Sequence, residues 1–162
     1  MLLGLSIVVI VVLIVSDKVS PRFYPLYIFV VAVALQLSRT LVSPNIAGTD
    51  MLYELYFANI VKVGGVWDPG FSVLNLSISN YYAMLSIAVL PNVYSILLNL
   101  ETVLVLKLIY PVIVAFVPLG LYEIFRMHVK FSSKSAFLAV FLFMSFYAFF
   151  GPNLIIARHE IA

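Results

Sequence analysis

The chain has 162 residues, of which 64% are hydrophobic and 10% are charged, and its mean hydropathy is +1.16. A water-soluble domain carries roughly a quarter charged residues, so this composition excludes an ordinary soluble domain and predicts an integral membrane protein. The net charge of +2, without a run of Lys or Arg, argues against a nucleic-acid partner, and the absence of cysteine excludes disulfides and thiolate metal sites.

Several apolar runs approach or reach the length of about 20 residues that a helix needs to cross the hydrocarbon core. We predict membrane spans at residues 2–15, 23–42, 102–125 and 135–156, the last of them bent near Gly151-Pro152. The first run is short, and is either part of a span or a signal anchor. The predicted fold class is therefore all-α: a polytopic protein of the cell (plasma) membrane, with about four transmembrane helices plus juxtamembrane helices in an outer loop.

The segment 81–98 is apolar enough to be a further span, and the distribution of basic residues indicates where it lies. Connections rich in Lys and Arg stay in the cytoplasm. Two short connections hold such residues, namely Lys18, Arg22, Arg126, His128, Lys130 and Lys134. With both connections inside, residues 43–101 form an outer loop, and we predict that 81–98 is a juxtamembrane helix broken at Pro91-Asn92. The alternative of five full spans, which puts residues 126–134 outside, stays open.

Two acids four residues apart, Asp50 and Glu54, occur in the outer loop of this sparsely charged chain. They open a predicted helix at about residues 50–63, and at 100° per residue they share one face of it. We expect this face to be the wet edge of the helix. Gly64-Gly65 ends the helix, and Trp67 is expected at the depth of the membrane–water interface.

Carboxylates at a membrane surface can act as a general base toward an incoming hydroxyl, or can hold a divalent cation. In the predicted topology the last span delivers Arg158, His159 and Glu160 to the same face, where an Arg could bind phosphate in a bidentate manner. Structural roles stay open beside these: Asp50 as a helix N-cap, Glu54 paired with Lys62 or facing water, and Arg158 and Glu160 as interface anchors.

A resemblance follows from these residues. The run Asp50-x-x-x-Glu54, the aromatic-rich helix after it, Gly64-Gly65-x-Trp67 and Pro69 resemble the first external loop of membrane glycosyltransferases of the GT-C class. The chain is most similar to an uncharacterised, largely archaeal family of predicted multi-spanning membrane proteins. The similarity continues through Asn80–Ser86, Lys107–Pro111, Pro118–Arg126 and Ala157–Ala162. The adjacent second acid and the Pro-Pro-Leu signature of some relatives are absent.

The resemblance implies a larger multi-spanning fold and a polyprenyl- or dolichyl-phosphate-linked sugar as donor, used on the outer membrane face with inversion at the anomeric carbon. It implies that Asp50 is catalytic, as base or as ligand of a divalent cation such as Mg²⁺ or Mn²⁺, and that Glu54 assists it. Arg158, His159, Glu160 and Trp67 would then bind substrate. Because the chain stops in mid-pattern at Ile161-Ala162, we expect the N-terminal part of such an enzyme, inactive alone.

Two other function classes stay open. A non-catalytic structural or assembly subunit would not need Asp50 or Glu54. A transporter segment would carry ionisable groups inside its spans, facing a cavity. The predicted spans are nearly free of charge, which favours the enzyme, and Lys107 is expected to reach the interface with its long side chain.

Overall fold

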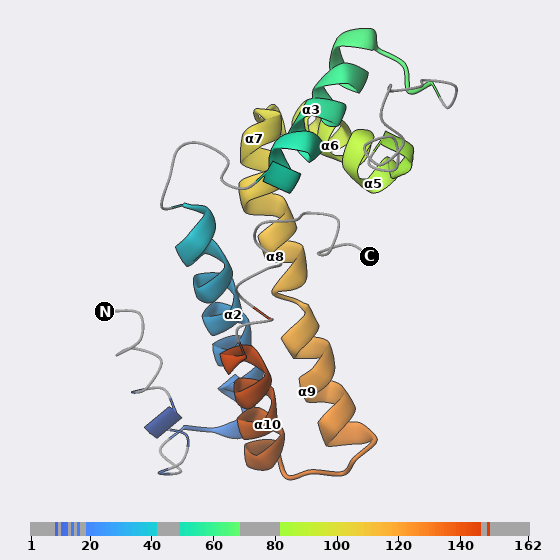
Figure 1. Cartoon of the computed structure of the whole chain (residues 1–162). Helices are drawn as coiled ribbons and strands as arrows, with labels where there is room; N and C mark the ends of the chain where they lie inside the picture. Colours follow the sequence, from blue (N-terminus) through green and yellow to red (C-terminus); the bar gives the residue numbers. More distant parts are fainter. Residues whose placement is uncertain are drawn as a thin grey trace.

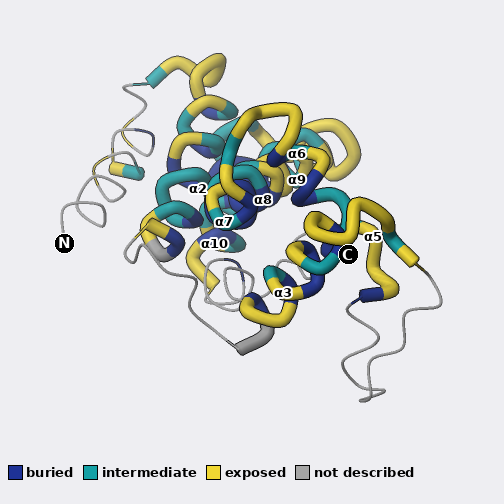
Figure 2. The backbone as a smooth tube through the Cα atoms, turned by 90° about the horizontal axis from the view of Figure 1, so that it is seen from above, coloured by how far each residue is buried: buried dark blue, intermediate teal, exposed yellow. Residues whose placement is uncertain are grey.

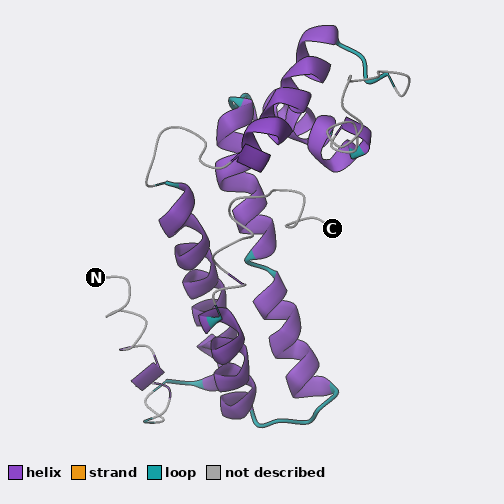
Figure 3. Cartoon of the chain, viewed as in Figure 1, coloured by secondary structure: helices purple, strands orange, loops and turns teal. Residues whose placement is uncertain are grey.

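The computed structural model describes residues 19–41, 49–68 and 82–146 and the single positions 9, 11, 12, 14, 16 and 149, with the backbone alone at residues 39, 49 and 50. All regular elements in these segments are helices, so the all-α class is confirmed (Figure 3). Two helical stretches, Pro21–Ser38 and Thr102–Met127, are long and apolar enough to cross a membrane. They correspond to the predicted spans 23–42 and 102–125, whereas the predicted span 2–15 lies largely outside the described residues.

The first well-described stretch starts with two prolines placed where a helix tolerates them. The 3₁₀ turn η1 (Pro21–Phe23) leads into α2 (Tyr24–Thr40), and each element has a proline in its first turn. The N–H groups of a first turn have no partner within the helix, so a proline there sacrifices no hydrogen bond.

A second stretch of 26 residues, Thr102–Met127, is a long helix made of consecutive pieces. These are α7 (Thr102–Leu104), the π-helical turn η2 (Val105–Ile109), α8 (Tyr110–Val114) and α9 (Val117–Met127). A proline ring crowds the carbonyl four residues before it and donates no hydrogen bond, so Pro111 and Pro118 each disturb the preceding turn. Pro118 accounts for the turn between α8 and α9 (Figure 1).

The helix α10 (Ser133–Ser145) runs antiparallel to α9 and is shorter than the predicted span 135–156. Ser132 caps it by accepting a hydrogen bond of 3.1 Å from the Ser135 N–H. The helix ends where Phe146 adopts an extended backbone (φ −70°, ψ 135°). The helix α10 therefore ends inside the predicted span, and the predicted bend at Gly151-Pro152 lies outside the described residues.

The helices α2, α8, α9 and α10 form a bundle around one apolar core. Tyr24 contacts Phe137 with ring centroids 5.5 Å apart, and Phe29 contacts Phe116 at 4.9 Å. The buried core also contains Ile28, Val31, Ala32, Val114, Ala115, Tyr122, Ala136, Val140 and Met144. Seen along the bundle, buried positions face the space between the helices and exposed positions face outward (Figure 2).

A second group of helices, the head, lies at one end of the bundle (Figure 1). It contains α3 (Thr49–Gly64), α5 (Leu85–Ala88), α6 (Leu90–Leu98) and α7. The helix predicted at 50–63 is present as α3. It ends at Gly64, and the next residue, Gly65, has a left-handed backbone with a φ of +68° that suits glycine. The helix predicted at 81–98 is split at Val89 rather than at Pro91-Asn92, because Pro91 occupies the first turn of α6, where it is tolerated.

Around this apolar core, the described helices combine a largely apolar surface with several buried polar side chains. Seven polar or charged side chains are buried among the described residues, namely Gln36, Thr40, Glu54, Asn92, Ser95, Thr102 and Lys107. Many large apolar side chains are exposed instead, including Phe23, Leu26, Val30, Ile96, Leu97, Phe116, Val117, Ile124, Leu138 and Leu142. Large apolar surface of this kind marks contact with lipid or with protein.

Candidate functional site

The face of α3 that carries Glu54 is packed against the rest of the protein. Glu54 is 0% exposed, and its neighbours on that face, Met51, Phe57 and Ala58, are buried too. Met51 packs in a cluster with Val105, Leu106 and Tyr110 of the long helix. Our expectation of a wet edge is therefore wrong for Glu54: the face that we assigned to water is the contact face between the head and the long helix.

Lys107 is the second buried charge of this region. It lies in the π-helical turn η2 and is 5% exposed, so our expectation that its side chain reaches the interface is also wrong. Pro111 cannot donate to the carbonyl of Lys107, which favours the irregular turn at this place. Single π-helical turns inside α-helices are frequent at functional sites. Glu54 and Lys107 each have a hydrogen-bonding or electrostatic partner.

The last turns of α2 add two uncharged polar groups to the same end of the bundle. Gln36 is 0% exposed and Thr40 is 8% exposed, and α2 contacts η2. The Gln36 Nε2 donates to the Phe149 carbonyl over 3.0 Å. Within the described part of the chain, the Gln36 Oε1 and the Thr40 Oγ1 are buried without a hydrogen-bond partner. Buried polar atoms of this kind are rare and call for an explanation. We call Gln36, Thr40, Glu54 and Lys107 the junction residues.

Trp67 is held inside the head. Its Nε1 donates to the Tyr82 carbonyl over 3.0 Å, and its ring stacks on that of Tyr82 at 6.2 Å and 23°. The Asp68 N–H donates to the Tyr82 hydroxyl over 3.0 Å. The indole is partly buried, and its predicted contact with substrate stays a prediction.

Two further polar side chains, Asn92 and Lys62, tie the head together through contacts that sequence reasoning did not identify. The Asn92 Nδ2 donates to the carbonyls of Ala58 at 2.7 Å and Ala88 at 3.1 Å. The Lys62 Nζ donates to the Ser95 Oγ at 3.2 Å and to the Thr102 Oγ1 at 3.1 Å, which links α3 with α6 and α7. The available signal was the presence of Asn and Ser in an otherwise apolar helix, where polar groups usually face a partner.

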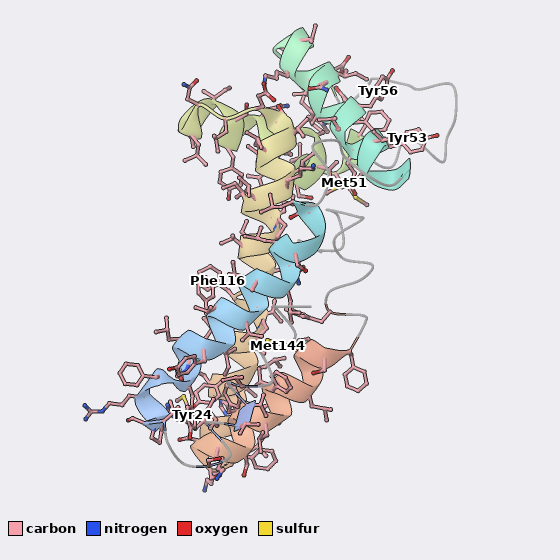
Figure 4. The ribbon with its side chains drawn as sticks, turned by 90° about the vertical axis from the view of Figure 1, so that its left-hand side faces the viewer. Tyr24, Met51, Tyr53, Tyr56, Phe116 and Met144 are labelled. Atoms are coloured by element: carbon pink, nitrogen blue, oxygen red, sulfur yellow. The ribbon has the colours of Figure 1, made fainter. Side chains whose placement is uncertain are left out.

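The outer side of α3 is a separate surface. Figure 4 shows Tyr53 and Tyr56 on this side, and Met51 on the inner side. A shallow pocket of about 450 Å³ lies here, lined mainly by apolar atoms of Tyr56, Asn59, Ile60, Val63 and Gly64. Glu54 does not line this pocket, since it belongs to the opposite face of the helix.

Four predicted site residues have side chains outside the described part of the structure. Arg158, His159 and Glu160 lie outside the described residues, and Asp50 is described only by its backbone in the first turn of α3. The predicted meeting of Asp50 and Glu54 with the Arg-His-Glu cluster therefore stays a prediction. Among the described side chains, no group of three or more His, Cys, Asp or Glu residues has the geometry to hold a metal ion.

No protein-family model matches the chain, and neither a curated protein nor a solved structure is significantly similar to it. The junction residues and the exposed apolar surface are the features of the chain that bear on its function.

Proposed function

We propose that this chain is part of a membrane glycosyltransferase of GT-C type, which transfers a sugar from a polyprenyl- or dolichyl-phosphate donor on the outer membrane face. The observation that carries the proposal is the fully buried carboxylate of Glu54, on a head helix packed against the end of a helix of membrane-spanning length. Burying a carboxylate is costly unless partners compensate for it, so such groups are candidates for function.

Placement in a membrane is the first part of the proposal, and the exposed apolar side chains of the helices support it. Exposed Phe116 and Val117 on the long helix, and Leu138 and Leu142 on α10, would contact acyl chains. The exposed Ile96 and Leu97 of α6 would enter the outer leaflet, while its polar Asn92 and Ser95 face inward. An apolar outer surface, with the few polar side chains turned inward, suits a lipid environment.

In the proposed reaction the acceptor hydroxyl attacks the anomeric carbon of the donor sugar. The new carbon–oxygen bond forms as the bond to the phosphate oxygen breaks, and the electron pair leaves with the phosphate. The hydroxyl proton passes to Asp50 as general base. Glu54, one turn further along α3, is proposed to orient this first turn, and Lys107 to offset the charge of the departing phosphate. A divalent cation needs several oxygen ligands, which the described side chains alone do not supply, so no step is assigned to one.

Two substitutions test the proposal in the full protein. We expect Asp50→Asn to lower kcat for sugar transfer about 100-fold or more, the usual contribution of a general base. Glu54→Gln removes the charge with little change in shape and should also lower kcat. The matched control is Glu123→Gln, because Glu123 is a half-exposed acid whose observed partner is Arg126 at 3.6 Å. Unchanged turnover in Asp50→Asn and Glu54→Gln, with helix content preserved, would assign the chain to a structural or assembly role.

The membrane orientation has its own test. The chain contains no cysteine, so single cysteines can be introduced at the exposed positions Glu101 in the head and Lys130 at the far end of the bundle. We expect an impermeant thiol reagent to label Glu101→Cys from outside the cell and Lys130→Cys only after the membrane is opened. Labelling of both positions from one side would contradict the proposed placement.

A transporter is the second candidate, and the buried Lys107 favours it. Ionisable groups inside spans commonly mark an ion or substrate pathway. Purified protein in liposomes should then support a proton or ion flux that Lys107→Met abolishes. Sugar transfer without any such flux would leave the glycosyltransferase as the better explanation.

A further inference from the structure

The end of the bundle opposite the head gathers basic side chains from three helix ends. η1 precedes α2 here, α9 ends at Met127 and α10 begins at Ser133. The contact between Tyr24 and Phe137 shows that the starts of α2 and α10 lie side by side. We call this region the basic end; its positively ionisable residues are Arg22, Arg126, His128, Lys130 and Lys134.

Basic side chains outnumber acidic ones among the described residues of the basic end, and Lys134 has an interaction partner of its own. Glu123 is the acid found there, and it pairs with Arg126 at 3.6 Å while both side chains stay about half exposed. The exposed charged side chains described in the head are one base, Lys62, and two acids, Asp68 and Glu101, so this end has no excess of positive charge. Positive charge is therefore concentrated at the end of the molecule that lies away from the head.

Basic and apolar residues alternate from residue 126 to 131, over the end of α9 and the connection to α10, and all of them are exposed. Arg126, His128 and Lys130 alternate with Met127, Val129 and Phe131, and the three apolar side chains are exposed to 66%, 48% and 43%. A connection that faced only water would have no need for three exposed apolar side chains in six residues. Apolar and basic groups side by side are typical of a segment at a lipid headgroup boundary.

The connection has a defined conformation that presents these side chains. Lys130 adopts a left-handed backbone (φ +56°), and the Phe131 N–H donates to the Phe125 carbonyl over 3.1 Å. The rings of Phe125 and Phe131 lie 6.0 Å apart. These contacts fold the connection back against the end of α9, so the basic and apolar groups are held next to one another.

We infer that the basic end binds the headgroups of anionic phospholipids in the leaflet on that side of the membrane. Met127, Val129 and Phe131 would enter the boundary between headgroups and acyl chains, and Arg126 and Lys130 would contact the phosphodiesters. Arg22 would extend the same surface on the side of α2. The inference rests on the proposed membrane placement and is independent of sugar transfer. Each Lys or Arg near an anionic surface contributes about a fivefold gain in affinity.

A fluorescence titration tests the inference on the whole chain. Trp67 is the single tryptophan, so the parent variant is Trp67→Phe combined with Phe131→Trp, which places one emitter in the connection. The parent is titrated in detergent micelles with brominated phosphatidylglycerol and, separately, with brominated phosphatidylcholine. We expect phosphatidylglycerol to quench the emission at much lower concentration. Adding Arg126→Gln and Lys130→Gln should weaken that quenching about 25-fold, or fivefold for each charge.

Lys62→Gln in the head is the control, because it removes a positive charge at the other end of the molecule. It should leave the titration unchanged, whereas each of Arg126→Gln and Lys130→Gln alone should weaken the quenching about fivefold. Equal quenching by the two lipids would overturn the inference. So would an equal weakening by Lys62→Gln, since the effect would then follow net charge alone. If the double variant loses helix content, Arg22→Gln replaces it, with an expected weakening of about fivefold.

Discussion

Tyr122 and Tyr110 allow a sharp test of the packing, because the same substitution should change stability in opposite directions at the two sites. Tyr122 lies in the bundle core and is 1% exposed, and within the described structure its hydroxyl has no hydrogen-bond partner. Tyr110 is 0% exposed, but its hydroxyl donates to the Ser86 carbonyl and so links the long helix to α5. Replacing either residue by Phe removes one oxygen and keeps the ring.

The magnitudes follow from the hydrogen bonds. A buried polar group without a partner costs about 1–3 kcal/mol. Tyr122→Phe removes that cost and should raise the free energy of unfolding by about 1 kcal/mol or more. Tyr110→Phe removes the hydrogen bond from the Tyr110 hydroxyl, and the Ser86 carbonyl loses this donor. The free energy of unfolding should therefore fall by about 1–2 kcal/mol. For a chain of this length, 1 kcal/mol corresponds to a shift of about 2–4 °C in Tm.

The assay is thermal unfolding of the full chain in one mild detergent, followed by circular dichroism of the helices, with wild type and both variants measured side by side. We expect the Tm of Tyr122→Phe to rise and that of Tyr110→Phe to fall. A clear fall of the Tm in Tyr122→Phe would refute the reasoning, because it would mean that the Tyr122 hydroxyl is hydrogen-bonded in the native protein.

Three further stability predictions use the same assay. Asn92→Ala removes two hydrogen bonds to the carbonyls of Ala58 and Ala88, but it also removes the buried Oδ1 that has no partner among the described residues, so it should destabilise the head by about 1 kcal/mol. Phe137→Ala leaves a cavity at a fully buried core position and should cost about 3–5 kcal/mol. Gly65→Ala meets no neighbouring atom, so its expected cost of about 1 kcal/mol comes only from the backbone φ of +68°.

Each of these predictions has an outcome that would contradict it. A neutral Asn92→Ala would mean that α3 and α6 do not need this link, and a neutral Phe137→Ala would mean that α2 and α10 do not pack as described. An unchanged Tm in Gly65→Ala would show that the end of α3 can adopt another turn without cost.

The local elements of this protein follow from local features of its sequence. The apolar runs of α2 and the long helix, and the paired glycines after α3, predict helices whose observed bounds differ from the predicted ones by a few residues. These features act within a few turns of chain, so they are visible without knowing the fold. The break in the segment 81–98 was misplaced because a proline can either end a helix or occupy its first turn, and the sequence does not distinguish the two.

The candidate site depends instead on which helix faces meet. Periodicity placed Asp50 and Glu54 on one face of α3, but whether water or protein covers that face depends on how the head packs on the long helix. Lys107 near a helix end would ordinarily extend to the interface, and here the packing of the helices around η2 buries it. Composition and run length thus determined an apolar, helical chain, because each residue contributes to them independently. Burial of the junction charges was decided by tertiary contacts between segments far apart in the sequence, since burial is a property of the neighbours as much as of the residue.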